Sequence, residues 1–144
     1  MIVTKSRDIL WLAALYFIFY AVTCQAAVVV ICHPDLPTLD KTELFRIYTG
    51  RMVRIDDTAV YPVNLKHGAP ARSAFFEKVL GKSDDDYVSY WIVRRAIGKG
   101  VPPPELDDPE QVLDFVRETP GAVGYLEKTG SDLSGVNIVL TTDD

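Results

Sequence analysis

The most apolar part of the chain is its beginning. Lys5 and Arg7 precede an unbroken run of apolar and aromatic residues that extends over residues 9–22. A short basic segment followed by an apolar run of this length is typical of a secretory signal peptide. Small residues stand at Cys24 and Ala26, the two positions that a signal peptidase reads. The pattern therefore predicts an exported protein that is cleaved after Ala26.

An uncleaved membrane anchor is the alternative interpretation of this segment. No charged residue occurs over residues 9–31, which is long enough to cross a bilayer at about 20 residues per crossing. However, Gln25 interrupts the apolar run, and the β-branched residues 28–31 are more typical of a buried strand. Lipid attachment at Cys24 is disfavoured, because Thr23 is a poor residue before a lipid-modified cysteine. We therefore expect a periplasmic protein.

Beyond a signal peptide of residues 1–26, we expect residues 27–144 to form one domain in which strand-like and helix-like patterns alternate. Continuous apolar, β-branched runs predict strands over residues 27–32, 59–65, 122–126 and 136–141. Three- and four-residue spacing predicts helices over residues 39–49, 71–80, 84–97 and 109–118. Their expected N-caps are Thr38, Ser83 and Asp108, with Pro70 in a first turn. The alternation predicts one three-layer α/β domain with a mixed, mostly parallel sheet and flanking helices.

The predicted helix over residues 84–97 carries both acidic and aromatic residues. The acidic residues 84–86 complement the positive end of the helix dipole, which explains them better than a metal site does. Tyr87, Tyr90 and Trp91 recur at helical spacing. This spacing predicts that they pack in the core and do not stack on a ligand.

Charge and motif content exclude several classes of function. The whole chain has a formal net charge of −5, and loss of the basic signal peptide would leave the remainder more acidic. A nucleic-acid partner is excluded, because such binding requires basic patches. No cofactor is expected, and the sequence contains no serine-hydrolase, zinc-protease or phosphate-loop motif. We therefore expect a protein that is not an enzyme.

Cysteine and histidine use predicts neither a disulfide nor a metal site. Cys32 is the only cysteine after the predicted cleavage point, so no intrachain disulfide can form and a buried strand thiol is expected. His33 and His67 lie too far apart in sequence to suggest a shared metal ion. A hydrolytic triad built on either histidine has no motif to support it.

The most informative segment, residues 63–73, runs from a strand through a glycine-containing turn into a helix. The first turn of such a helix exposes unpaired N–H groups and a partial positive charge, which attract anions. The residues predicted to contact a small oxyanion are Lys66, His67, Gly68, Ala71, Arg72 and Ser73. The alternative is an ordinary strand-to-helix turn with solvated basic side chains.

Several motifs resemble those of phosphate-binding proteins from ABC transporters. Residues 40–50 are similar to a helix that ends in Ile-Phe/Tyr-x-Gly, and residues 119–126 are similar to the strand T-P-G-A-I-G-Y. The Pro-x-Arg-x-x-Phe pattern of residues 70–75 and the pair Tyr90-Trp91 resemble short, single-lobe exported members of this group. The resemblance covers residues 35–126.

This resemblance implies a periplasmic-binding-protein-like lobe that binds phosphate or another small oxyanion without catalysis. It also implies a transporter or sensor partner in the membrane. Full-length members have two lobes that close on their ligand, whereas this chain is long enough for one, so pairing of two chains is expected. The family's hydroxyl-bearing loop reads Ala69-Pro70-Ala71 here, so tight phosphate binding does not carry over. The alternative is a periplasmic protein-interaction or sensory accessory module that has lost the ligand.

Overall fold

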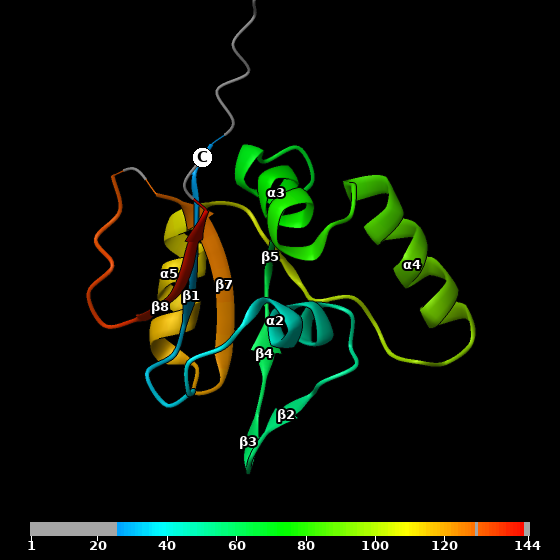
Figure 1. Ribbon diagram of the computed structural model, residues 1–144, viewed down its shortest axis with the longest axis horizontal. Coiled ribbons are helices and arrows are strands. Elements are labelled where there is room, and N and C mark those ends of the chain that lie inside the picture. Colours follow the sequence, from blue (N-terminus) through cyan, green and yellow to red (C-terminus); the bar gives the residue numbers. More distant parts are fainter. Residues whose placement is uncertain (1–25, 129, 143–144) are drawn as a thin grey trace, which may run out of the picture.

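The structure, a computed structural model, describes residues 26–128 and 130–142 (Figure 1). The predicted signal peptide lies outside the described residues up to its last position. Every described strand, helix and core residue lies between Val28 and Thr142, so a chain that starts at Ala27 contains the whole described core. Within these ranges no helix is long and apolar enough to cross a membrane.

The main sheet has four strands in the order β4–β7–β1–β8 (Figure 1). At its centre, β1 (Val28–Cys32) has all five residues buried, as its continuous apolar sequence predicts. β7 (Ala122–Glu127) and β8 (Asn137–Thr142) flank β1 on either side. β4 (Tyr61–Pro62) completes the sheet beside β7.

The mixed character of the sheet is confirmed, but the expectation that it is mostly parallel is wrong for the main sheet. β1 runs antiparallel to both β7 and β8, and β4 and β7 are parallel. The sequence pattern treats each helix as a crossover between parallel strands. Instead, α2 (Lys41–Tyr48) leads into a hairpin of β2 (Arg54–Ile55) and β3 (Thr58–Ala59). The chain then enters the main sheet at β4 in the direction opposite to β1.

Helices cover both faces of the main sheet. Gly124 of β7 lets α5 (Pro109–Glu118) approach closely, because a Cβ at this position would collide with that helix. The next residue, Tyr125, points to the opposite face. Its ring stacks on Phe75 of α3 (Pro70–Phe75), with the ring centroids 4.0 Å apart. The predicted three-layer α/β arrangement is therefore confirmed.

The helices begin at side chains that cap their free N–H groups. Ser83 and Asp108 cap α4 and α5, as predicted. For α2 the cap is Asp40, not Thr38. The Asp40 carboxylate accepts the Glu43 backbone N–H at 2.8 Å, and Glu43 accepts the Asp40 N–H at 2.9 Å. This reciprocal capping box fixes the start of the helix two residues later than expected.

Two predicted elements are divided in the structure. The strand predicted over residues 59–65 consists of β3, β4 and β5 (Asn64–Leu65), and each of these pairs with a different partner. The partner of β5 is β6 (Glu105–Leu106), which runs parallel to it. The helix predicted over residues 71–80 begins as α3 and ends as the π-helical turn η1 (Phe76–Leu80).

The helix α4 (Asp84–Ala96) lies at the edge of the molecule, on the right in Figure 1. Of its 13 residues, Tyr87 and Trp91 are buried and Tyr90 is partly buried. The prediction that these aromatic residues pack in the core is therefore confirmed, and most of the helix surface faces solvent.

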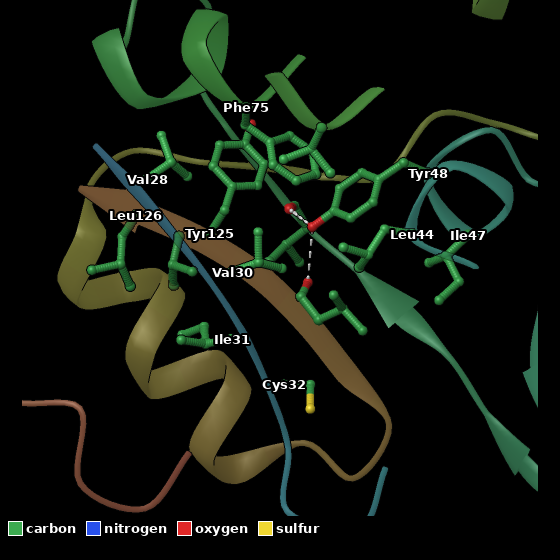
Figure 2. Close-up of a cluster of buried hydrophobic side chains, with 14 of the residues drawn as sticks. Val28, Val30, Ile31, Cys32, Leu44, Ile47, Tyr48, Phe75, Tyr125 and Leu126 are labelled. Carbon is green, nitrogen blue, oxygen red and sulfur yellow. Dashed lines mark hydrogen bonds between the residues drawn. The ribbon is translucent and has the colours of Figure 1, made fainter. Parts of the chain in front are cut away.

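Aromatic rings fill the core between α2, α3 and the sheet (Figure 2). The rings of Tyr48 and Phe75 meet edge to face, with centroids 4.8 Å apart, and Tyr125 lies beside both. The Tyr48 hydroxyl donates to the carbonyl oxygen of Val63 at 3.0 Å. Cys32 is buried nearby, as predicted, and burial raises the pKa of its thiol.

Candidate functional site

The predicted anion site is a tight turn between β5 and α3. The Lys66 backbone N–H donates to Leu106, and its carbonyl oxygen accepts the N–H of Ala69 at 3.2 Å. Gly68 has a φ of 88°, with open space where a side chain would point. Ala69 caps α3 without a side-chain hydrogen bond. The turn therefore has the conformation that the sequence predicts, and its outer surface is open.

The six predicted residues divide into an exposed and a buried group. Lys66, His67, Gly68 and Ser73 are exposed, whereas Ala71 and Arg72 are buried. The side chain of Arg72 is only 2% exposed. Of the two cations Lys66 and Arg72 of the predicted site, Arg72 thus lies inside the protein.

Arg72 uses all three guanidinium nitrogens for contacts within the protein. Its Nε lies 3.1 Å from both carboxylate oxygens of Asp84, and one terminal nitrogen lies 2.9 Å from Asp84 Oδ1. The other terminal nitrogen donates to the Leu65 carbonyl at 2.9 Å and to Glu105 Oε1 at 2.5 Å. The guanidinium also lies over the ring of Phe76, 5.0 Å from its centroid. Two carboxylates therefore occupy the positions that an oxyanion would take.

The two acidic partners come from elements that sequence reasoning did not connect with this turn. Asp84 is the first residue of α4, and its side chain is 14% exposed. Glu105 lies on β6, where it pairs in register with Asn64 of β5, and its side chain is 50% exposed. Sequence reasoning interpreted Asp84 as a helix-dipole residue alone. Nothing local to Glu105 signals its role, because a two-residue parallel strand carries no periodic pattern.

His67 contacts the same carboxylate as Arg72. Its Nδ1 lies 2.8 Å from Oδ2 of Asp84, and its side chain is 72% exposed. Burial acts to lower the pKa of Arg72, but the hydrogen bonds that Arg72 donates to Asp84 and Glu105 outweigh it and raise that pKa above its usual value. The turn carries the cations Lys66 and Arg72 beside the carboxylates of Asp84 and Glu105, which offset their charge. The local potential at the turn is therefore less positive than its sequence suggests.

A buried network of hydrogen bonds connects β5, the strand before the turn, to the core. Tyr125 donates its hydroxyl to Asn64 Oδ1 at 3.1 Å and accepts the Leu65 backbone N–H at 3.2 Å. Asn64 Nδ2 donates to the Tyr87 hydroxyl at 3.3 Å, which in turn donates to the Tyr48 carbonyl at 2.9 Å. Burial raises the pKa of Tyr87 to about 12 and raises that of Tyr125 as well. The network joins α2, β5, α4 and β7. It holds the backbone of Leu65, whose carbonyl oxygen accepts a hydrogen bond from Arg72.

Neither histidine lies in a metal cluster within the part of the chain that the structure describes. That part contains no group of three or more His, Cys, Asp or Glu side chains able to hold a metal ion. His33 Nδ1 lies 3.5 Å from the Asp35 carboxylate, and His67 pairs with Asp84 as described.

A second surface feature lies on α4, next to the Arg72 cluster. A cavity of about 230 Å³ lies between α4 and the segment that contains Pro102, Pro103 and Glu105. Its walls include Val88 and Ile92, which are 41% and 63% exposed, together with the buried Trp91. The charged residues that line the cavity are Arg72, Arg95 and Glu105. Sequence reasoning singled out the buried face of this helix and did not identify the apolar character of its outer face.

The fold resembles that of solved phosphate transport receptors. An ABC-type phosphate transport receptor from Vibrio cholerae matches 80% of this chain and 46% of its own, with a TM-score of 0.58 and 15% identity. A protein from Clostridium perfringens, assigned as a phosphate ABC transporter substrate-binding protein and solved with bound phosphate, matches 79% of this chain and 45% of its own. Its TM-score is 0.60 and its identity is 20%. No protein-family model and no curated protein sequence matches the chain.

These matches confirm, at the level of the fold, the resemblance that residues 35–126 carry. The chain has the periplasmic-binding-protein fold over about four fifths of its length and spans less than half the length of either receptor.

Proposed function

We propose that this chain is a non-catalytic binding module whose partner is a protein and not a free oxyanion. The observation that carries the proposal is that the guanidinium nitrogens of Arg72 all have hydrogen-bond partners within the protein. An oxyanion that approaches the Lys66–Ser73 turn meets a guanidinium whose nitrogens already donate to Asp84, Glu105 and Leu65. Binding would bring a third anion next to two carboxylates, which costs free energy at close range in a partly buried site.

The exposed apolar face of α4 supports a protein partner. Val88, Ile92 and Val93 are exposed on this helix, and Ile97 and Val101 are exposed at its end and in the loop that follows. Val88 and Ile92 are one helical turn apart and line the same cavity, and exposed apolar surface of this kind is typical of protein interaction sites.

Oxyanion binding remains the second candidate, because the fold resembles that of phosphate transport receptors. The same turn would provide the site, through Lys66, His67, Gly68, Ala71, Arg72 and Ser73. Glu105 is the partner that must move, and its half-exposed side chain can turn toward solvent.

A thermal shift measurement separates the two candidates. A ligand that binds only the folded state adds about 2.7 kcal/mol at a 100-fold excess over its Kd, which raises Tm by about 10 °C for a domain of this size. Residues 27–144 should show no phosphate-dependent rise in Tm beyond that caused by sulfate at equal ionic strength. A rise specific to phosphate would overturn the proposal in favour of oxyanion binding.

Export of the protein is part of the same proposal. Residues 1–26 would act as a signal peptide and residues 27–144 as the binding module in the periplasm, in contact with a transporter or sensor in the membrane. Protein recovered from the periplasmic fraction should begin at Ala27 on N-terminal sequencing. Recovery from the membrane fraction with an intact N-terminus would favour the uncleaved anchor.

A further inference from the structure

One exposed face of α4 has an acidic residue at one end, two apolar residues in the middle and a basic residue at the other end. Asp85, Val88, Ile92 and Arg95 follow one another at steps of three, four and three residues, so they lie along one side of the helix. All four are exposed. We propose that this α4 face, defined as Asp85, Val88, Ile92 and Arg95, binds the same face of a second copy of the chain in antiparallel orientation. The inference rests on the proposed function, because it names the protein partner.

Apolar side chains are concentrated on this helix. Large hydrophobic residues are exposed at eight positions of the described chain, and three of them, Val88, Ile92 and Val93, lie on α4. A fourth, Ile97, is its C-cap and is 63% exposed. Helices of globular proteins are normally stabilised by burial of one apolar stripe. α4 buries its aromatic stripe and leaves two apolar pairs exposed on different sides of the helix, Val88 with Ile92 and Val93 with Ile97.

The charges at the two ends of the α4 face favour a second copy of the chain in antiparallel orientation. A two-fold axis near position 90 that places Val88 against Ile92 of the second copy also places Asp85 against Arg95 of that copy. Each of these contacts occurs twice, as the symmetry of such an interface requires. Neither Asp85 nor Arg95 forms an ion pair with a residue that the structure describes, so both remain available.

A parallel arrangement is disfavoured by the same charges. It would bring the acidic first turn, Asp84 to Asp86, next to the acidic first turn of the second copy, and Arg94 and Arg95 next to their counterparts. Antiparallel helices also oppose their dipoles. The α4 face is therefore complementary to itself in one of the two orientations.

The expected dimer is weak. One helix pair with two apolar residues on each side buries less surface than the interface of about 1,600 Å² that is standard for stable complexes. The groove of about 230 Å³ beside Val88 and Ile92 adds apolar contact at the edge of the pair. We expect a dissociation constant in the micromolar range, and hence a protein that is monomeric when dilute and dimeric when concentrated.

Sedimentation velocity of residues 27–144 over a series of concentrations tests the inference. The wild type should shift from monomer to dimer, and Ile92→Ser should weaken association about tenfold or more. Ile138→Ser is the matched control, because Ile138 is 55% exposed on β8, away from α4. It should associate as the wild type does.

Charge exchange tests the orientation. Asp85→Arg and Arg95→Asp should each weaken association, because each places like charges together, and the double variant should restore it to within about twofold. A wild type that stays monomeric at about 1 mM would overturn the inference, as would a dimer that Ile92→Ser leaves intact. Either outcome leaves the proposed function standing as long as phosphate gives no thermal shift, so the two failures can be distinguished.

Discussion

Arg72 and Asp84 form a two-point ion pair that joins the start of α3 to the start of α4. The Nε and one terminal nitrogen of Arg72 both contact the Asp84 carboxylate, at distances of 2.9 to 3.1 Å. Planar guanidinium and carboxylate groups match in this geometry, which makes it one of the stronger ion-pair arrangements in proteins. The charge that could attract an anion is thus used to fix the two helices together.

Asp84→Asn should destabilise the fold. The change leaves the buried Arg72 guanidinium with a single charged partner, Glu105, so we expect a loss of about 3 kcal/mol in the free energy of unfolding, at the low end for a broken buried pair. Urea denaturation measures it. Asp86→Asn is the control, because Asp86 is an exposed residue of the same first turn, and it should change stability by less than about 0.5 kcal/mol. Equal effects of the two variants would show that the ion pair contributes nothing beyond the helix dipole.

Gly121→Ala should be far more harmful than Gly68→Ala. Both glycines have a positive φ, 83° and 88°, so alanine costs about 1 to 2 kcal/mol of backbone strain at either position. At Gly121 the new Cβ would also collide with the carbonyl oxygen of Ala59, whereas at Gly68 no atom lies within 4 Å of it. We expect a total loss of about 4 kcal/mol for Gly121→Ala. Thermal melting of both variants checks this, and equal losses would contradict the close contact between β3 and the turn before β7.

Stability should fall in alkaline solution. Burial raises the pKa of Tyr87 to about 12 and raises those of Tyr48 and Tyr125 too, whereas tyrosine in an unfolded chain titrates near pH 10. Above about pH 10 the unfolded chain loses protons that the folded protein keeps, so the free energy of unfolding decreases until the pH exceeds the folded pKa. Urea denaturation at several pH values measures the slope. Tyr87→Phe should make it shallower, and an unchanged slope would argue against this origin.

The sequence allowed prediction of the elements whose signals are local. The buried strand β1, the N-caps Ser83 and Asp108 and the aromatic inner face of α4 all follow from residues adjacent to one another in the chain. Strand direction in the main sheet did not follow, because it depends on how the β2–β3 hairpin redirects the chain. The turn of the candidate site was also placed correctly.

The state of Arg72 could not be predicted from the sequence. Its partners Asp84 and Glu105 lie 12 and 33 residues further along the chain. Asp84 had a sufficient local explanation as a helix-dipole residue, and Glu105 follows a proline-rich segment that gives no strand signal. Basic residues at a helix start predict an anion site only when no carboxylate reaches them through the fold.

The central claim is that the carboxylates bound to Arg72 prevent phosphate from binding. Calorimetric titration of phosphate into residues 27–144, with and without the substitution Glu105→Gln, tests it most directly. Glu105 is the more exposed partner of Arg72, so its replacement by the isosteric amide should keep the fold and remove one negative charge. We predict no saturable heat for the wild type up to about 10 mM phosphate, and measurable binding by Glu105→Gln, with a Kd at or below about 1 mM. Saturable binding by the wild type, unchanged in Glu105→Gln, would contradict this account.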